Sequence, residues 1–156
     1  MIEDKVLKGH DLFSSLTPDE IHKLSKFAYE KEFHEGESIF EYNQACSHFF
    51  MLKKGDVYLL LPANPKEFSF AVSKIKAGEL FGLSPLLNGD RYTAQAKCYS
   101  EAKVLAIEAK PFLELIRTNS HVGLNIINRV AEIYYARYLN ILKKLQDVVS
   151  QVSLVR

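Results

Sequence analysis

The spacing of apolar and polar residues changes twice along the chain. These changes divide the sequence into a helical start, a strand-rich middle and a helical end. Near the N-terminus, Thr17, Pro18 and Glu20 form a helix-start signal, with a threonine N-cap, a proline in the first turn and a glutamate that completes a capping box. Apolar residues at helical spacing predict a helix from there through about residue 27.

From residue 29 to residue 107 the pattern changes to short runs of β-branched and aromatic residues, which are separated by Gly, Pro and Asn. The clearest runs are 49–52, 57–61, 68–75 and 104–107. The glycines that fall between runs, where tight turns require positive φ, are Gly36, Gly55, Gly78 and Gly82. This spacing is expected of a sandwich or barrel, so we predict an α+β chain in which a β body and flanking helices share one core.

After Pro111 the pattern is helical again, first around residues 112–116 and then in one long segment from about residue 122. Along this segment apolar residues alternate at spacings of four and three, which is the a/d pattern of a coiled coil. These positions are Ile127, Ala131, Tyr134, Tyr138, Ile141, Leu145, Val148 and Val152. A second stripe of Ile126, Val130, Ile133 and Leu142 favours packing against the β body. We expect both: a helix that packs on its own domain in its first half and pairs with the same helix of a second subunit, giving a homodimer.

Composition narrows the class of protein. The chain has 156 residues, 47% hydrophobic and 25% charged, with a formal net charge of +1, as expected for one globular unit. We divide it into a β-roll unit with N-terminal helices, residues 1–118, and a long dimerisation helix, residues 119–156.

The acidic start is unlike a signal peptide, no apolar run reaches membrane-spanning length, and Cys46 and Cys98 are too few for a disulfide framework. We therefore expect a cytoplasmic protein that binds no membrane.

Two activities are not expected from the residues. The acidic side chains show no pairing with a nucleophile or histidine that suggests catalysis, and no Walker-type or serine-elbow motif occurs, so we predict that the chain is not an enzyme. Basic residues occur in nothing longer than a pair, such as Lys143 and Lys144, and we expect no direct binding of nucleic acid.

The most informative stretch runs from Gly78 to Leu87, GELFGLSPLL, and is followed by Arg91, Tyr92, Thr93 and Ala94. A glycine turn that leads into a short helix presents backbone N–H groups that attract anions. Residues 78–94, here called the cassette, are therefore a candidate phosphate site.

Several motifs in this order resemble the cyclic nucleotide-binding domain family. They are Leu12-Phe13-x-x-Leu16, Gly36-Glu37-Ser38-Ile39-Phe40, Phe50-Met51-Leu52-Lys53-Lys54-Gly55-Asp56-Val57, Gly78-Glu79-Leu80-Phe81-Gly82 and Val104-Leu105-Ala106-Ile107. The resemblance spans residues 11–145. It implies an eight-stranded jelly roll with helices at both ends, and, by similarity to the catabolite activator type, a long helix at the dimer axis. No helix-turn-helix domain follows that helix in this sequence.

The cassette departs from the family pattern at two positions. The resemblance implies a glutamate that binds the ribose hydroxyl after the cassette glycine, where this chain has Leu83, and an arginine against the cyclic phosphate, where it has Tyr92. Arg91 lies one residue early. Because alternate strand residues point to opposite faces, that shift directs Arg91 away from the pocket unless the loop is bulged. Two lost charged contacts of about 1.5–3 kcal/mol each make ordinary cAMP binding doubtful.

The sequence leaves three interpretations open. The first is a small anion, such as cAMP, cGMP or a related anion, held by the cassette and by residues of the long helix that, as the resemblance implies, lie over the base. Its candidate residues are Gly82, Leu83, Ser84, Arg91, Tyr92, Thr93, Ala94, Arg137 and Tyr138. The second is a neutral effector beside Leu83 and Tyr92, or no effector at all, which leaves a degenerate dimerisation or docking module. The third is a haem or metal sensor that uses His34, Cys46 or His48. We favour a regulatory module that signals through its dimer helices to a protein partner that the sequence does not identify.

Overall fold

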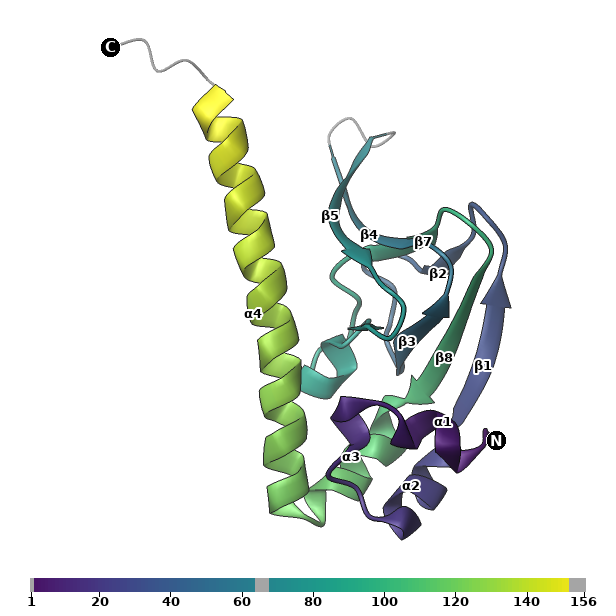
Figure 1. Ribbon diagram of the computed structural model, residues 1–156. Helices are drawn as coiled ribbons and strands as arrows, with labels where there is room; N and C mark the ends of the chain where they lie inside the picture. The colour runs from purple at the N-terminus through teal and green to yellow at the C-terminus, as the bar shows by residue number, and fades with distance from the viewer. Residues whose placement is uncertain (1, 64–67, 152–156) are drawn as a thin grey trace.

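Two four-stranded antiparallel sheets form the body of the computed structural model, which describes residues 2–63 and 68–151 (Figure 1). The strand order is β1-β8-β3-β6 in one sheet and β2-β7-β4-β5 in the other. The strands are β1 (Ala28–Phe33), β2 (Ser38–Phe40), β3 (His48–Lys54), β4 (Val57–Pro62), β5 (Ser69–Ile75), β6 (Leu80–Phe81), β7 (Gln95–Cys98) and β8 (Ala102–Glu108). The two sheets agree with the sandwich or barrel predicted from the turn signals and with the eight-stranded jelly roll that the resemblance implies.

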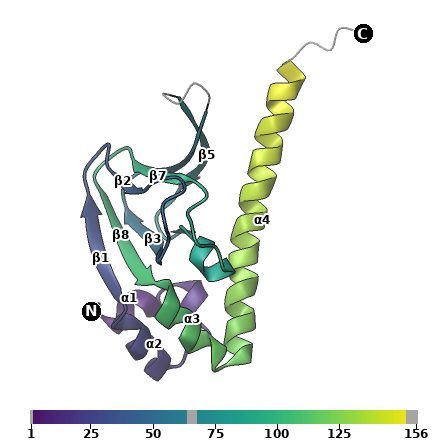
Figure 2. The same ribbon diagram turned by 180° about the vertical axis from the view of Figure 1, so that it is seen from behind.

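Helices gather at one end of this body and along one side (Figure 2). They are α1 (Asp4–Lys8), α2 (Pro18–Ser25), α3 (Ala109–Arg117) and α4 (Ser120–Gln151), with the short 3-10 helices η1 (Asp11–Phe13) and η2 (Ser84–Leu87). The predicted capping box starts α2: the Glu20 N–H donates to the Thr17 hydroxyl at 3.3 Å, and the Thr17 N–H donates to the Glu20 carboxylate at 2.8 Å. The α+β class is confirmed.

Strand β3 divides the interior into two hydrophobic clusters. Because successive side chains of a strand point to opposite faces, Phe49 and Met51 join the cluster beneath the helices, whereas Phe50 and Leu52 join the cluster between the sheets. The second cluster contains the aromatic rings that adjoin the cassette. Burial on both faces explains why β3 appears in the sequence as a continuous apolar run.

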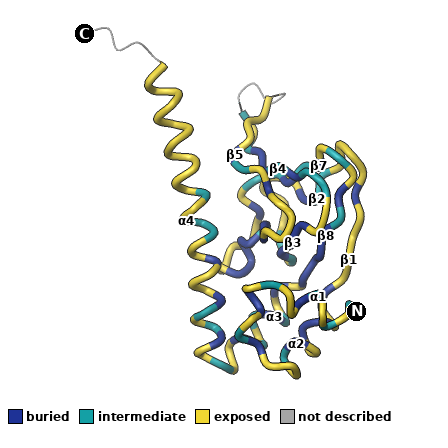
Figure 3. Tube along the Cα trace, viewed as in Figure 1, coloured by how far each residue is buried: buried dark blue, intermediate teal, exposed yellow. Residues whose placement is uncertain are grey.

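Helix α4 changes its surroundings along its length. Val122, Ile126 and Val130 are buried in the cluster beneath the helices, and Ile133 packs partly against it. Beyond residue 137 every described residue of the helix is exposed, and Figure 3 shows this half leading away from the body. Leu142 is 41% exposed, so its predicted place in the packing stripe is wrong. At this level the helix still contacts the body through other residues, since Lys144 Nζ donates to the Ala71 carbonyl at 3.0 Å.

Most predicted a/d positions are at least partly accessible to solvent in the single chain. Ile127, Ala131, Tyr138, Ile141, Leu145 and Val148 are exposed. Tyr134 instead is half-buried against its own domain. Val152 lies outside the described residues. None of the described helices combines the length and the apolar character needed to cross a membrane.

Candidate functional site

The cassette and α4 enclose a cavity of about 260 Å³. It contains every sequence candidate except Arg91: the cassette contributes Gly82, Leu83, Ser84, Tyr92, Thr93 and Ala94, and α4 contributes Arg137 and Tyr138. Five further lining residues were not expected from the sequence: Phe40, Leu59, Leu61, Val72 and Ser73. Tyr134 and Ile141 also line the cavity, although the sequence predicted them only for the dimer seam. The alternation of Leu59 and Leu61 in β4 was a usable signal, because it places both side chains on one face.

Gly82 makes the turn that opens the cassette. Its φ is 66°, in the region that glycine adopts without steric cost. A Cβ there would lie 3.0 Å from ring atoms of both Phe40 and Phe50, so two aromatic side chains occupy the space that any other residue needs. The glycine is therefore required both by backbone conformation and by packing.

The short helix after the turn offers fewer backbone donors than expected. Helix η2 has four residues, Pro85 has no N–H, and the Leu86 N–H donates to the Leu83 carbonyl at 3.0 Å. The cassette therefore presents chiefly the N–H groups of Leu83 and Ser84. A bound anion requires more than this helix terminus.

Leu83 and Tyr92, which stand where the resemblance implies a glutamate and an arginine, both point inward. Leu83 is 1% exposed and Tyr92 is 4% exposed. The Tyr92 hydroxyl donates to the His48 carbonyl at 2.7 Å, and burial raises the pKa of Tyr92 to about 12, so the phenol stays neutral. Tyr92 therefore forms an aromatic wall of the cavity and carries no charge.

Arg91 does not enter the cavity. Its side chain is exposed, and its guanidinium donates to the Asn43 carbonyl at 2.7 Å, while its backbone forms an isolated bridge with Ala45. Strand alternation explains the result, since Tyr92 takes the inward position. The loop adjustment that would have turned Arg91 inward does not occur.

Arg137 brings positive charge to the cavity instead. It is half-buried, and its guanidinium donates to the carbonyl of Leu80, in strand β6 of the cassette. Burial lowers the pKa of Arg137, and the charges of nearby Tyr134 and Glu79 partly offset this decrease. Within residues 2–63 and 68–151, no carboxylate forms an ion pair with it. The guanidinium retains donors for a further acceptor.

Tyr134 and Ser84 complete the polar groups beside Arg137. Burial raises the pKa of Tyr134, and a hydrogen bond with the Ser84 hydroxyl opposes that change. The hydroxyls of these two residues and of Thr93 line the same cavity as Arg137, among mostly apolar side chains.

The haem candidates lie apart in three different settings. His34 is exposed with its Nδ1 3.0 Å from Glu101, the Cys46 thiol donates to the Gly89 carbonyl at 3.2 Å, and the His48 ring contacts Tyr29 and Ser47. In the described chain no three His, Cys, Asp or Glu side chains converge as metal ligands. The geometry gives this interpretation no support.

Comparison with protein families identifies this architecture. A family model described as cyclic nucleotide-binding domain matches residues 30–119. The chain belongs to the cyclic nucleotide-binding domain family. The family is of the regulatory or sensor type. A search of curated proteins found no match.

Solved structures share the fold over most of the chain. A putative cyclic nucleotide-binding protein from Geobacter metallireducens is 27% identical, with a TM-score of 0.75 over 88% of this chain and 99% of that one. The sensor domain of the transcriptional regulator DNR from Pseudomonas aeruginosa is 14% identical, with a TM-score of 0.74 over 98% and 95%. The regulatory domain of Toxoplasma gondii PKA, solved with cAMP, is 22% identical, with a TM-score of 0.69 over 83% and 48%. At these identities the last two show the fold alone.

Proposed function

We propose that this chain is a sensor module that binds a small anionic effector, such as a cyclic nucleotide, in the 260 Å³ cavity and signals through α4. The observation that carries the proposal is the half-buried guanidinium of Arg137, which lines the same cavity as the Ser84 and Thr93 hydroxyls and has no carboxylate partner in the described chain. It takes the role that the family assigns to a cassette arginine. A guanidinium that binds an anion at a partly dry site forms a strong, charge-assisted contact.

The cavity limits the size of the effector. Its volume of about 260 Å³ is slightly below the roughly 300–1,000 Å³ common for small-molecule sites. Leu59, Leu61 and Val72 give it an apolar wall. We infer an effector that places an anionic group at Arg137 and a compact apolar or planar part against the β4 and β5 side.

Signalling follows from the helix that closes the cavity. Tyr138 and Ile141 line the cavity and also occupy a/d positions of the proposed dimer seam. An effector that contacts them shifts the balance between arrangements of two paired helices, provided that it binds those arrangements with different affinity. The proposed homodimer, with the helix from residue 119 as its signalling unit, therefore connects effector binding to a protein partner.

Isothermal titration with cAMP and with cGMP tests the proposal. We expect saturable binding that weakens by about tenfold or more in Arg137→Ala, because one charged contact is lost. Arg91→Ala is the matched control, since that arginine lies outside the cavity. Circular dichroism of each variant establishes that the fold is intact.

A second candidate function has an observation of its own. The buried side chains of Leu83 and Tyr92 reduce the space available to a ligand, as expected for a dimerisation module without an effector. No binding of either nucleotide, together with a dimer whose affinity is unchanged by them, would favour this alternative.

A further inference from the structure

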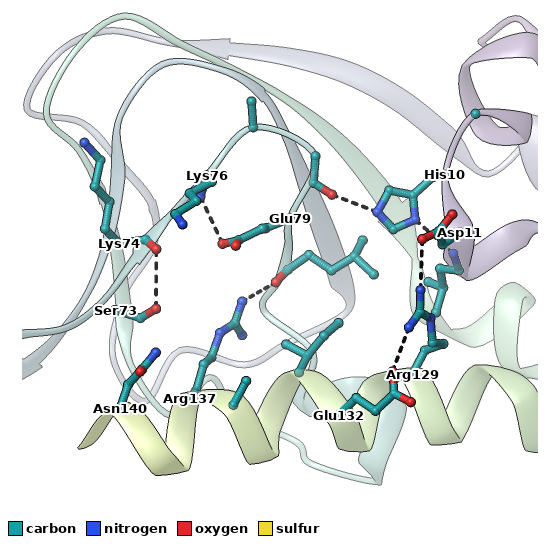
Figure 4. Close-up of a pocket in the computed structure, with 17 residues that line it drawn as sticks. His10, Asp11, Ser73, Lys74, Lys76, Glu79, Arg129, Glu132, Arg137 and Asn140 are labelled. Atoms are coloured by element: carbon teal, nitrogen blue, oxygen red, sulfur yellow. Dashed lines mark hydrogen bonds and ion pairs between the residues drawn. The ribbon is translucent and has the colours of Figure 1, made fainter. Parts of the chain in front are cut away.

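A second, larger cavity of about 620 Å³ lies on the other side of Arg137 (Figure 4). Its walls are α4, the segment from β5 to β6, and η1 with the residues before it. Figure 4 shows Ser73, Lys74, Lys76 and Asn140 toward one end, and His10, Asp11, Arg129 and Glu132 at the other. Its volume is within the range typical of small-molecule sites.

At the end formed by His10 and Arg129, the polar side chains already have protein partners. Arg129 lies 2.9 Å from the Asp11 carboxylate and 2.7 Å from the Glu132 carboxylate. His10 Nε2 is 2.7 Å from the Gly78 carbonyl, and its Nδ1 accepts the Leu12 N–H at 3.1 Å. These contacts connect η1, α4 and the β5–β6 segment and leave this end without excess positive charge.

The opposite end carries excess positive charge. Lys74 has a carboxylate partner, Asp56, at 2.7 Å. Lys76 and Arg137 have none among the described residues. The Glu79 carboxylate, on the same side, accepts the backbone N–H of Lys76 at 3.0 Å. Because Asp56 offsets Lys74, two unpaired cations, Lys76 and Arg137, line this end together with one carboxylate, and the excess of positive charge favours an anionic ligand.

We propose that this cavity binds a small phosphate-bearing molecule, with its phosphate between Lys76 and Arg137. Arginine and lysine donors suit the oxygens of a phosphate group. Asn140 lines the same end and offers an amide to the remainder of the molecule. Because Arg137 borders both cavities, occupancy of one changes the affinity of the other, and the effect is reciprocal.

The test is an amide chemical-shift titration of the full chain with pyrophosphate at constant ionic strength. We expect saturable shifts centred on Ala77 and Gly78. Lys76→Ala and Arg137→Lys each weaken binding by about tenfold, because the first removes a charged contact and the second keeps the charge but loses the planar, two-donor geometry of the guanidinium. Lys143→Ala removes the same charge from a residue of α4 that lines neither cavity, and we expect it to leave the affinity unchanged.

Ser84→Ala separates this proposal from the proposed function, since Ser84 lines only the smaller cavity. Pyrophosphate binding that is unchanged in Ser84→Ala and weakened in Lys76→Ala supports a second site. Binding weakened by Ser84→Ala but not by Lys76→Ala overturns it and places the anion in the smaller cavity. Absence of saturable shifts up to about 10 mM pyrophosphate also overturns it.

Discussion

The ring of Tyr92 stacks on the ring of Phe40, with centroids 3.9 Å apart and an interplanar angle of 17°. Phe40 in turn contacts Phe50 and Phe81, so the residue at the family's arginine position belongs to an aromatic cluster between the two sheets. The tyrosine therefore contributes to stability where the family uses a charge for binding.

Restoring the family's residue at this position should destabilise the domain. We expect Tyr92→Arg to lower the free energy of unfolding by about 3–5 kcal/mol, because it buries a charge without a partner among aromatic rings. Tyr92→Phe keeps the stack and removes only the hydrogen bond to His48, at a cost of about 1 kcal/mol. Urea unfolding of both variants measures the difference, and equal stabilities would show that position 92 tolerates a charge.

Gly82 gives a second stability prediction. Gly82→Ala imposes positive φ on a residue with a Cβ and also forces that Cβ against the Phe40 and Phe50 rings. Gly36→Ala is the matched control, since its φ is 85° but nothing lies within 4 Å of the added Cβ. We expect Gly36→Ala to cost about 1–2 kcal/mol from backbone strain, and Gly82→Ala to cost about 1–3 kcal/mol more from overpacking. Thermal unfolding of the two variants tests the ordering, which a more stable Gly82→Ala protein would contradict.

The sequence predicted the fold well because its signals are local. The capping box at Thr17 and the positive-φ glycines act within a few residues, and each occurs where it was expected. Strand alternation alone also indicated that Arg91 points away from the cavity, as the structure has it.

The candidate site was less predictable because it depends on contacts between distant segments. Arg137 donates to the carbonyl of Leu80, 57 residues earlier, and no periodicity encodes that hydrogen bond. The larger cavity likewise joins His10, Lys76 and Arg137 from three separate segments. Its charge balance becomes visible only when the partners of each lysine and arginine are known.

His34 should give stability a pH dependence. The hydrogen bond that His34 donates to the Glu101 carboxylate, together with the charge of that carboxylate, raises the pKa of His34 above its usual 6.5 at an exposed position. The protonated pair therefore stabilises the fold fully below about pH 6.5, and this stabilisation is lost as pH rises through the higher folded-state pKa. An NMR titration should show the raised pKa in the native protein and its return toward 6.5 in Glu101→Gln. An unshifted His34 in the native protein would contradict the ion pair.

The exposed distal half of α4 predicts self-association. Leu145 and Val148 are 57% and 60% exposed and occupy successive a/d positions, so pairing of two helices would bury both. Leu145→Glu places a charge in that seam, and we expect it to weaken the dimer by about 100-fold or more. Lys143→Glu changes charge two residues away, on the face opposite the seam in this register, and should leave the dimer intact. Sedimentation equilibrium of the three proteins tests the seam. A native chain that stays monomeric at about 100 μM would contradict self-association through this helix.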